Sequence, residues 1–161
     1  MKKNMLFGLV LIIVCLLIGL FFLRNTSKDV DDVIMKISIY PTAVLDETYL
    51  FVVRSDKTLE VSKGVRKNQT SDFHLRKVID TKKRELTAEE SKVLLDAANR
   101  IEETSDNITK KLIADGWDVS IYYKGKIMDL NYYGNESEDL DVLVNQLILL
   151  SPITVDLHGW S

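Results

Sequence analysis

The sequence predicts an α+β protein: an N-terminal transmembrane helix, then one domain of mostly antiparallel sheet with two helices on one face. Three observations predict it. The chain opens with an uncharged apolar run, Met5–Leu23. Two later segments repeat apolar residues at helical spacing, and several others alternate apolar with polar residues, as half-buried strands do. The predicted order after the anchor is β-ββ-β-α-ββ-α-β, in which both helices cover one sheet face.

The apolar run has the length of a membrane span. At about 1.5 Å per residue, Met5–Leu23 extends roughly 28 Å, close to the hydrocarbon core of a bilayer. A cleaved signal peptide has a shorter core and small residues at its exit, whereas Leu23 and Arg24 follow two phenylalanines here. Cys15, the single cysteine, lies inside the run without small residues before it. We therefore expect a retained anchor that contacts the lipid bilayer, with Cys15 facing lipid.

The charges beside the run predict its orientation. Lys2 and Lys3 precede it, and lysines near a span favour the cytoplasmic side. The chain is then divided into an anchor (1–24), a tether (25–32) and an extracytoplasmic domain (33–161), in a single-pass protein of the cell membrane. A domain without cysteine suits a bacterial surface. The alternative is a membrane-tethered regulatory domain that faces the cytoplasm.

Alternation predicts the first half of the sheet. Four strands are expected at residues 33–40, 48–54, 58–63 and 73–82. A three-residue loop between the second and third strands sets Val53 opposite Leu59, which keeps the apolar residues on one face. In the fourth strand, Phe73, Leu75 and Ile79 are expected to point inward.

The second half contains both helices. Thr87 and Glu90 have the spacing of a capping box, which predicts a helix from there to about residue 103. Ser137 is the expected cap of a second helix over 138–150. Between them, strands at 117–123 and 126–133 form a hairpin in which Ile121 meets Met128 across a two-residue turn. Alternating residues from Ile153 predict a short final strand over 153–158.

The charges are unevenly distributed along the domain. Residues 54–84 contain ten bases and four acids, whereas residues 85–161 contain six bases and fifteen acids. The basic segment is either a stripe that meets anionic headgroups or wall polymers, or it lies beside acidic helices that neutralise it. We favour neutralisation. A nucleic-acid partner is not expected, because the domain is net acidic and its bases lack interleaved aromatic residues.

Two Asp-x-His triplets are the only candidates for a metal site. Asp72 and His74 form one, and Asp156 and His158 form the other. Residues i and i+2 of a strand share a face, so two neighbouring triplets would offer four ligands suited to zinc. This is the basis of an alternative function as a metal-dependent hydrolase. The chain has no phosphate-binding glycine loop and no nucleophile elbow, so we expect a protein that is no enzyme and needs no cofactor.

A binding surface is predicted on the polar face of the second hairpin. Tyr122 and Tyr133 fall on that face beside Asp118 and Asn131. An aromatic and polar surface of this kind is typical of protein interfaces. The sequence therefore predicts a non-enzymatic binding or protein-interaction module, with an envelope or membrane protein as partner.

Overall fold

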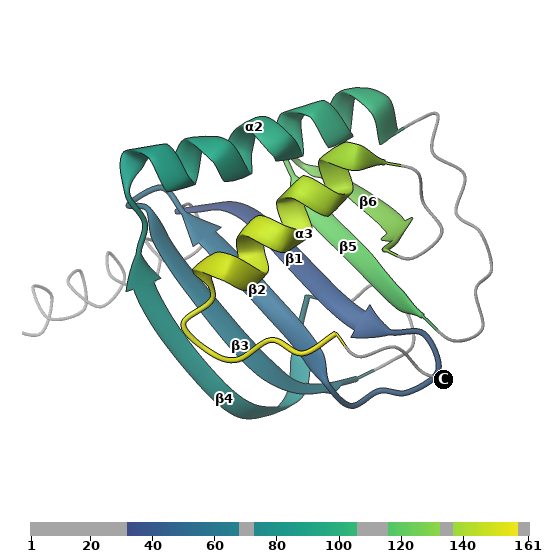
Figure 1. Ribbon diagram of the computed structural model, residues 1–161. Coiled ribbons are helices and arrows are strands. Elements are labelled where there is room, and N and C mark those ends of the chain that lie inside the picture. The colour runs from purple at the N-terminus through teal and green to yellow at the C-terminus, as the bar shows by residue number, and fades with distance from the viewer. Residues whose placement is uncertain (1–31, 68–72, 106–115, 133–136, 158–161) are drawn as a thin grey trace, which may run out of the picture. The chain divides into compact units, whose positions relative to one another are not determined.

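The computed structural model describes residues 32–67, 73–105, 116–132 and 137–157. The predicted anchor and all but one residue of the predicted tether lie outside these ranges. Within them, no helix is both long and apolar enough to span a bilayer. The described chain forms one antiparallel sheet of six strands with two helices (Figure 1), which confirms the α+β class.

The elements follow the order β1 (Val33–Pro41), β2 (Thr48–Arg54), β3 (Thr58–Arg66), β4 (Leu75–Glu85), α2 (Ala88–Thr104), β5 (Trp117–Tyr123), β6 (Lys126–Asn131) and α3 (Glu138–Leu150). In the sheet the strands lie in the order β4-β3-β2-β1-β5-β6. Both helices cover the same face (Figure 1), which we call the helix face; the other is the rear face.

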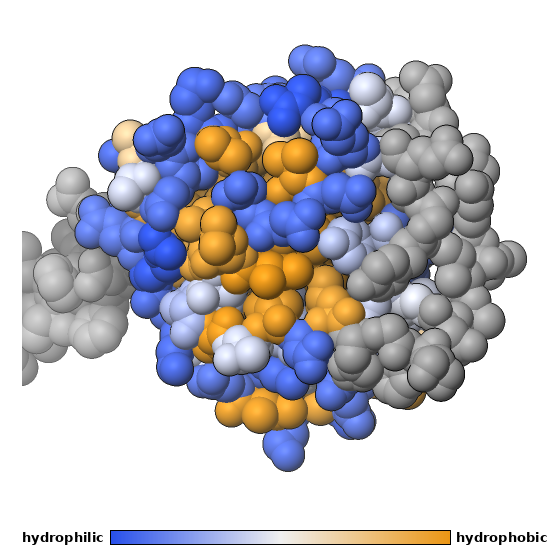
Figure 2. All heavy atoms as spheres, in the orientation of Figure 1, coloured by the Kyte–Doolittle hydropathy of each residue, from blue (hydrophilic) through white to orange (hydrophobic). Residues whose placement is uncertain are grey.

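The core lies between the helices and the sheet. Alternate residues of the central strands, such as Ile37, Phe51 and Val119, are fully buried there. The stripes predicted for the helices supply the other side, with Leu94 in α2 and Leu143 in α3 both inaccessible to solvent. Figure 2 shows apolar side chains gathered between and beneath the two helices, with hydrophilic residues around them.

Both predicted hairpins are confirmed in register. Val53 pairs with Leu59, and Tyr123 pairs with Lys126. The two-residue turn has positive φ at both positions, 49° for Lys124 and 79° for Gly125, as a tight hairpin turn requires. Lys57 holds the left-handed position of the first loop, at φ 67°.

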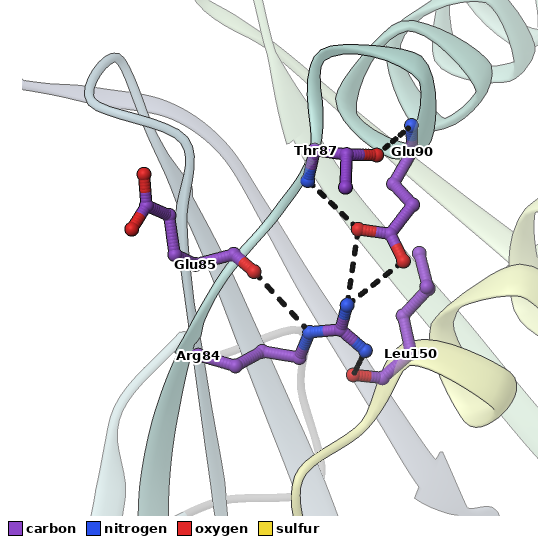
Figure 3. A network of polar contacts seen from close by, with 5 residues as sticks. All are labelled: Arg84, Glu85, Thr87, Glu90 and Leu150. Carbon is purple, nitrogen blue, oxygen red and sulfur yellow. Dashed lines mark hydrogen bonds and ion pairs between the residues drawn. The ribbon is translucent and has the colours of Figure 1, made fainter.

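The predicted capping box forms at the junction of β4, α2 and α3 (Figure 3). The Glu90 amide donates to the Thr87 hydroxyl at 3.1 Å, and the Thr87 amide donates to the Glu90 carboxylate at 2.8 Å. Arg84 donates to the same carboxylate at 2.8 Å and to the Leu150 carbonyl at 3.4 Å. The Thr87 amide and Arg84 together hold the pKa of Glu90 below its ordinary value. The stability that Glu90 contributes is therefore present above that ordinary pKa and is lost as the pH falls through the lowered one.

Replacing Thr87 by alanine is expected to lower the free energy of unfolding by about 1 kcal/mol, since the Glu90 amide loses its acceptor. Chemical denaturation of the full-length protein in detergent measures the difference. Thr154→Ala is the control, because Thr154 is exposed after α3. An equal effect of both substitutions would show that the cap does not stabilise α2.

The predicted final strand is wrong. The described part of it, residues 153–157, adopts no regular structure, although Ile153, Val155 and Leu157 pack against the core as their alternation suggests. The Asp156 amide donates to the Tyr49 hydroxyl of β2 at 3.2 Å. Tyr49 is part of the buried core, so this segment crosses the helix face of the sheet and does not lie along an edge. Strand backbones have no ladder groups directed towards a face, so no strand pairing forms.

β4 also differs from the prediction. Its pairing with β3 shifts register twice, between Lys63 and Gly64 and between Val65 and Arg66. The expected inward position of Ile79 is therefore wrong: its side chain is 59 % exposed. A Cβ on Gly64 would lie 2.2 Å from the Lys77 carbonyl oxygen. Only glycine permits the two backbones to approach so closely at this bulge.

Candidate functional site

The rear face of the second hairpin does not expose all of the predicted binding residues. Asp118 is 7 % exposed and Asn131 is 3 % exposed. Their side chains pair across the hairpin, where the Asn131 amide donates to the Asp118 carboxylate at 2.6 Å. The expectation that these two residues are exposed is wrong, and their bond instead ties β5 to β6.

A second polar chain crosses the same face. The Ser120 hydroxyl donates to the Asp129 carboxylate at 2.6 Å. Because its single proton is then used, the Tyr40 hydroxyl, 3.0 Å away, is the donor to Ser120. These contacts join β1, β5 and β6 by side chains, in addition to their backbone ladders.

The end of β3 and the residues at the start of β4 lie over this polar region. Phe73, just before β4, contacts Tyr122 of β5 edge to face at 6.2 Å. Arg66, the last residue of β3, stacks its guanidinium on the Tyr40 ring at 3.9 Å. In the sheet, β2 separates Arg66 from Tyr40, and three strands separate β4 from β5. The bulged β3–β4 pair therefore bends over the rear face to make these contacts. Tyr122 is half-buried as a result. Tyr133 lies outside the described residues, and its role stays a prediction.

Arg66 is the most unusual residue of this region. It is fully buried and donates to the carbonyl oxygens of Pro41 and Val44, each at 2.9 Å. Its Nε and Nη1 atoms have no hydrogen-bond partner among the described residues. Burial lowers the pKa of Arg66, and Asp118 acts in the opposite direction. No signal in the sequence indicated Arg66, because it lies beyond residue 63, where we expected the third strand to end, whereas β3 continues to Arg66.

The described residues do not test the predicted metal site, because they include only two of its four ligands. His74 and Asp156 lie on exposed parts of the chain, whereas Asp72 and His158 fall outside the described residues. Within those residues, no group of three or more candidate ligands comes together. The zinc site therefore stays a prediction.

β6 forms one edge of the sheet. Its pairing with β5 runs without a register shift, and in the described chain it pairs with no other strand. The Tyr132 amide donates to the Trp117 carbonyl of β5 at 2.9 Å. Because backbone directions alternate along an antiparallel strand, the amides and carbonyls of Ile127 and Asp129 point away from β5. β6 thus presents, at its outer side, ladder groups that pair with no other described strand.

A shallow groove lies beside this edge. Its volume is about 150 Å³, and it is lined by Ser105 at the end of α2 and by Lys126, Ile127, Met128, Asp129 and Leu130. The Ile127 side chain is 55 % exposed and lies opposite Tyr122 in the register of the hairpin. This site could not be predicted from the sequence, because the strand order that makes β6 an edge is not encoded in the alternation of any single strand.

β4 forms the other edge and has a different character. It is an 11-residue strand that is interrupted by its two register shifts and contains three lysines. Bulges and lysines are the features that prevent an edge strand from pairing with another chain. Of the two edges, β6 is therefore the one suited to accept an additional strand.

Comparison with models of known protein families gives no match to this chain, and a search of curated proteins finds no similar sequence.

Proposed function

We propose that this chain is a single-pass membrane protein whose extracytoplasmic domain is a non-enzymatic protein-interaction module. Its uncharged segment Met5–Leu23, preceded by two lysines, supports the location and orientation. The module binds an extended segment of an envelope or membrane protein by strand addition at β6. The observation that carries this proposal is the outward direction of the Ile127 and Asp129 backbone groups beside the groove.

Strand addition assigns a role to each side of β6. The partner's main chain pairs with the outward groups of Ile127 and Asp129, and alternate side chains point to opposite faces. Those on the helix face enter the groove near Ser105. Those on the rear face meet Ile127 and the neighbouring Tyr122, so the aromatic surface predicted from the sequence borders the same site. Asp118, tied to Asn131, holds the hairpin rigid.

Ile127→Pro is expected to abolish capture of the partner. Proline removes an outward amide, and it is tolerated on an edge strand where that amide pairs with nothing in the sheet. Ile127→Thr is the matched control, since it keeps the amide and the strand preference. Full-length baits of both variants and of the wild type are compared by pull-down from detergent-solubilised membranes. Circular dichroism of each bait checks that it is folded.

A partner recovered by the wild type and by Ile127→Thr, and lost with Ile127→Pro, supports strand addition. Equal recovery by all three baits contradicts it. If Tyr122→Ala loses the partner while Ile127→Pro keeps it, binding occurs on the rear face predicted from the sequence. Protease accessibility on intact cells tests the orientation separately, because a protected domain would face the cytoplasm.

A further inference from the structure

β4 presents a basic and partly apolar outer surface. Arg76, Lys77 and Lys82 are exposed and form no ion pair with any described residue. Between these bases, Val78 is 53 % exposed and Ile79 is 59 % exposed. Two consecutive aliphatic side chains are both exposed here because the bulge between the Asp80 and Val78 pairings interrupts the normal alternation. We call Arg76–Lys83 the β4 surface.

Two bases near the C-terminal end of β4 form ion pairs within the domain. Lys83 pairs with Glu60 at 3.1 Å, and Arg84 pairs with Glu90 at 2.8 Å. Asp80 is the single carboxylate inside the β4 surface, and it lies opposite Lys63 in the register. Within the described residues, the predicted neutralisation of the basic segment is therefore incomplete, and three cations remain around the aliphatic pair.

We propose that the β4 surface docks on the headgroups of an anionic phospholipid bilayer. This docking presupposes the membrane location proposed above. Lysine and arginine side chains lay their aliphatic stems along apolar material while their charged ends reach the headgroups. Val78 and Ile79 then enter the interface between the headgroups and the acyl chains. Strand pairing does not compete for this surface, because the bulges and lysines of β4 disfavour it.

The predicted tether keeps this surface within reach of the bilayer. Residues 25–32 extend by at most about 3.5 Å each, or roughly 28 Å in total. Docking through β4 would leave β6 available, because the two strands are opposite edges of the sheet. Phe73, which contacts Tyr122 next to β6, lies before the β4 surface and is not part of it. The lipid contact and the proposed strand addition can therefore occur at the same time.

Two single-cysteine proteins test the docking directly. In full-length Cys15→Ser protein, an environment-sensitive fluorophore is attached at Ile79→Cys or, as the matched control, at Ile127→Cys; the two native side chains are 59 % and 55 % exposed. Each protein is reconstituted into vesicles of phosphatidylcholine alone or with added phosphatidylglycerol. A nitroxide on the lipid headgroup quenches a probe that contacts the bilayer. We expect quenching of the Ile79 probe with phosphatidylglycerol and none of the Ile127 probe.

Neutralising the three unpaired bases, as Arg76→Gln, Lys77→Gln and Lys82→Gln together, is expected to weaken docking about a hundredfold, since each base near an anionic surface contributes about fivefold. High salt should have the same effect. Equal quenching in both kinds of vesicle, quenching of both probes, or no quenching with phosphatidylglycerol would each overturn the proposal. Flotation of the protein with phosphatidylcholine vesicles reports the anchor independently, so failure of the proposed location is recognised separately from failure of docking.

Discussion

Trp117→Ala is expected to lower the free energy of unfolding by about 3–5 kcal/mol, the range for deletion of a buried aromatic side chain. Trp117 is 1 % exposed and begins β5. Its ring lies 6.3 Å from that of Tyr49 in β2. The intervening strand β1 places Pro41 opposite Trp117. Loss of the indole therefore removes packing between three strands at once.

The effect should extend to the segment after α3. Tyr49 accepts a hydrogen bond from the Asp156 amide, so a Tyr49 ring that has lost its neighbour holds the segment after α3 less firmly. Chemical denaturation measures the stability, and hydrogen exchange of the Asp156 amide measures the local loosening. Leu149→Ala is the control, because Leu149 is 73 % exposed and its truncation should change stability by less than about 0.5 kcal/mol. A similar small effect for Trp117→Ala would contradict the packing described here.

Features encoded by neighbouring residues were predicted well. The capping box of Thr87 and Glu90, the helix over 138–150 and the registers of both hairpins are all confirmed. Each depends on residues a few positions apart, where hydrogen-bond geometry and alternation act directly. The sheet order and the direction of chain bends depend instead on contacts between distant segments, and no local pattern specifies them.

The bulges of β4 show why the site was predicted only in part. Nothing in the sequence distinguishes Gly64 from the other glycines among the seven, because the need for glycine there comes from the close approach of the distant Lys77 carbonyl. The resulting bend carries Phe73 onto Tyr122 and Arg66 onto Tyr40. The face that alternation predicted to be exposed is therefore partly closed, although the same alternation correctly assigned Asp118, Tyr122 and Asn131 to the side opposite the helices.

Arg66 binds this bend to the rest of the sheet. Its two bonds to Pro41 and Val44 hold the connection between β1 and β2, and its stacking on Tyr40 holds the end of β3 against β1. A buried guanidinium loses its hydration, and the unpaired Nε and Nη1 atoms are not compensated by any described residue. Arg66 therefore combines a favourable set of contacts with a desolvation penalty, and the two can be separated by substitution.

Arg66→Ala is expected to lower the free energy of unfolding by about 3–5 kcal/mol, because the buried Pro41 carbonyl and the half-buried Val44 carbonyl lose their donor, Asp118 loses a positive charge that acts on it and a cavity forms. Arg66→Met should recover at least about 1 kcal/mol of this loss, since methionine fills most of the side-chain volume and carries no charge to desolvate. Denaturation of both variants at equal detergent concentration measures the difference. If Arg66→Met were as unstable as Arg66→Ala, the hydrogen bonds and charge of Arg66 would outweigh its packing, and the guanidinium itself would be the group that secures the bend.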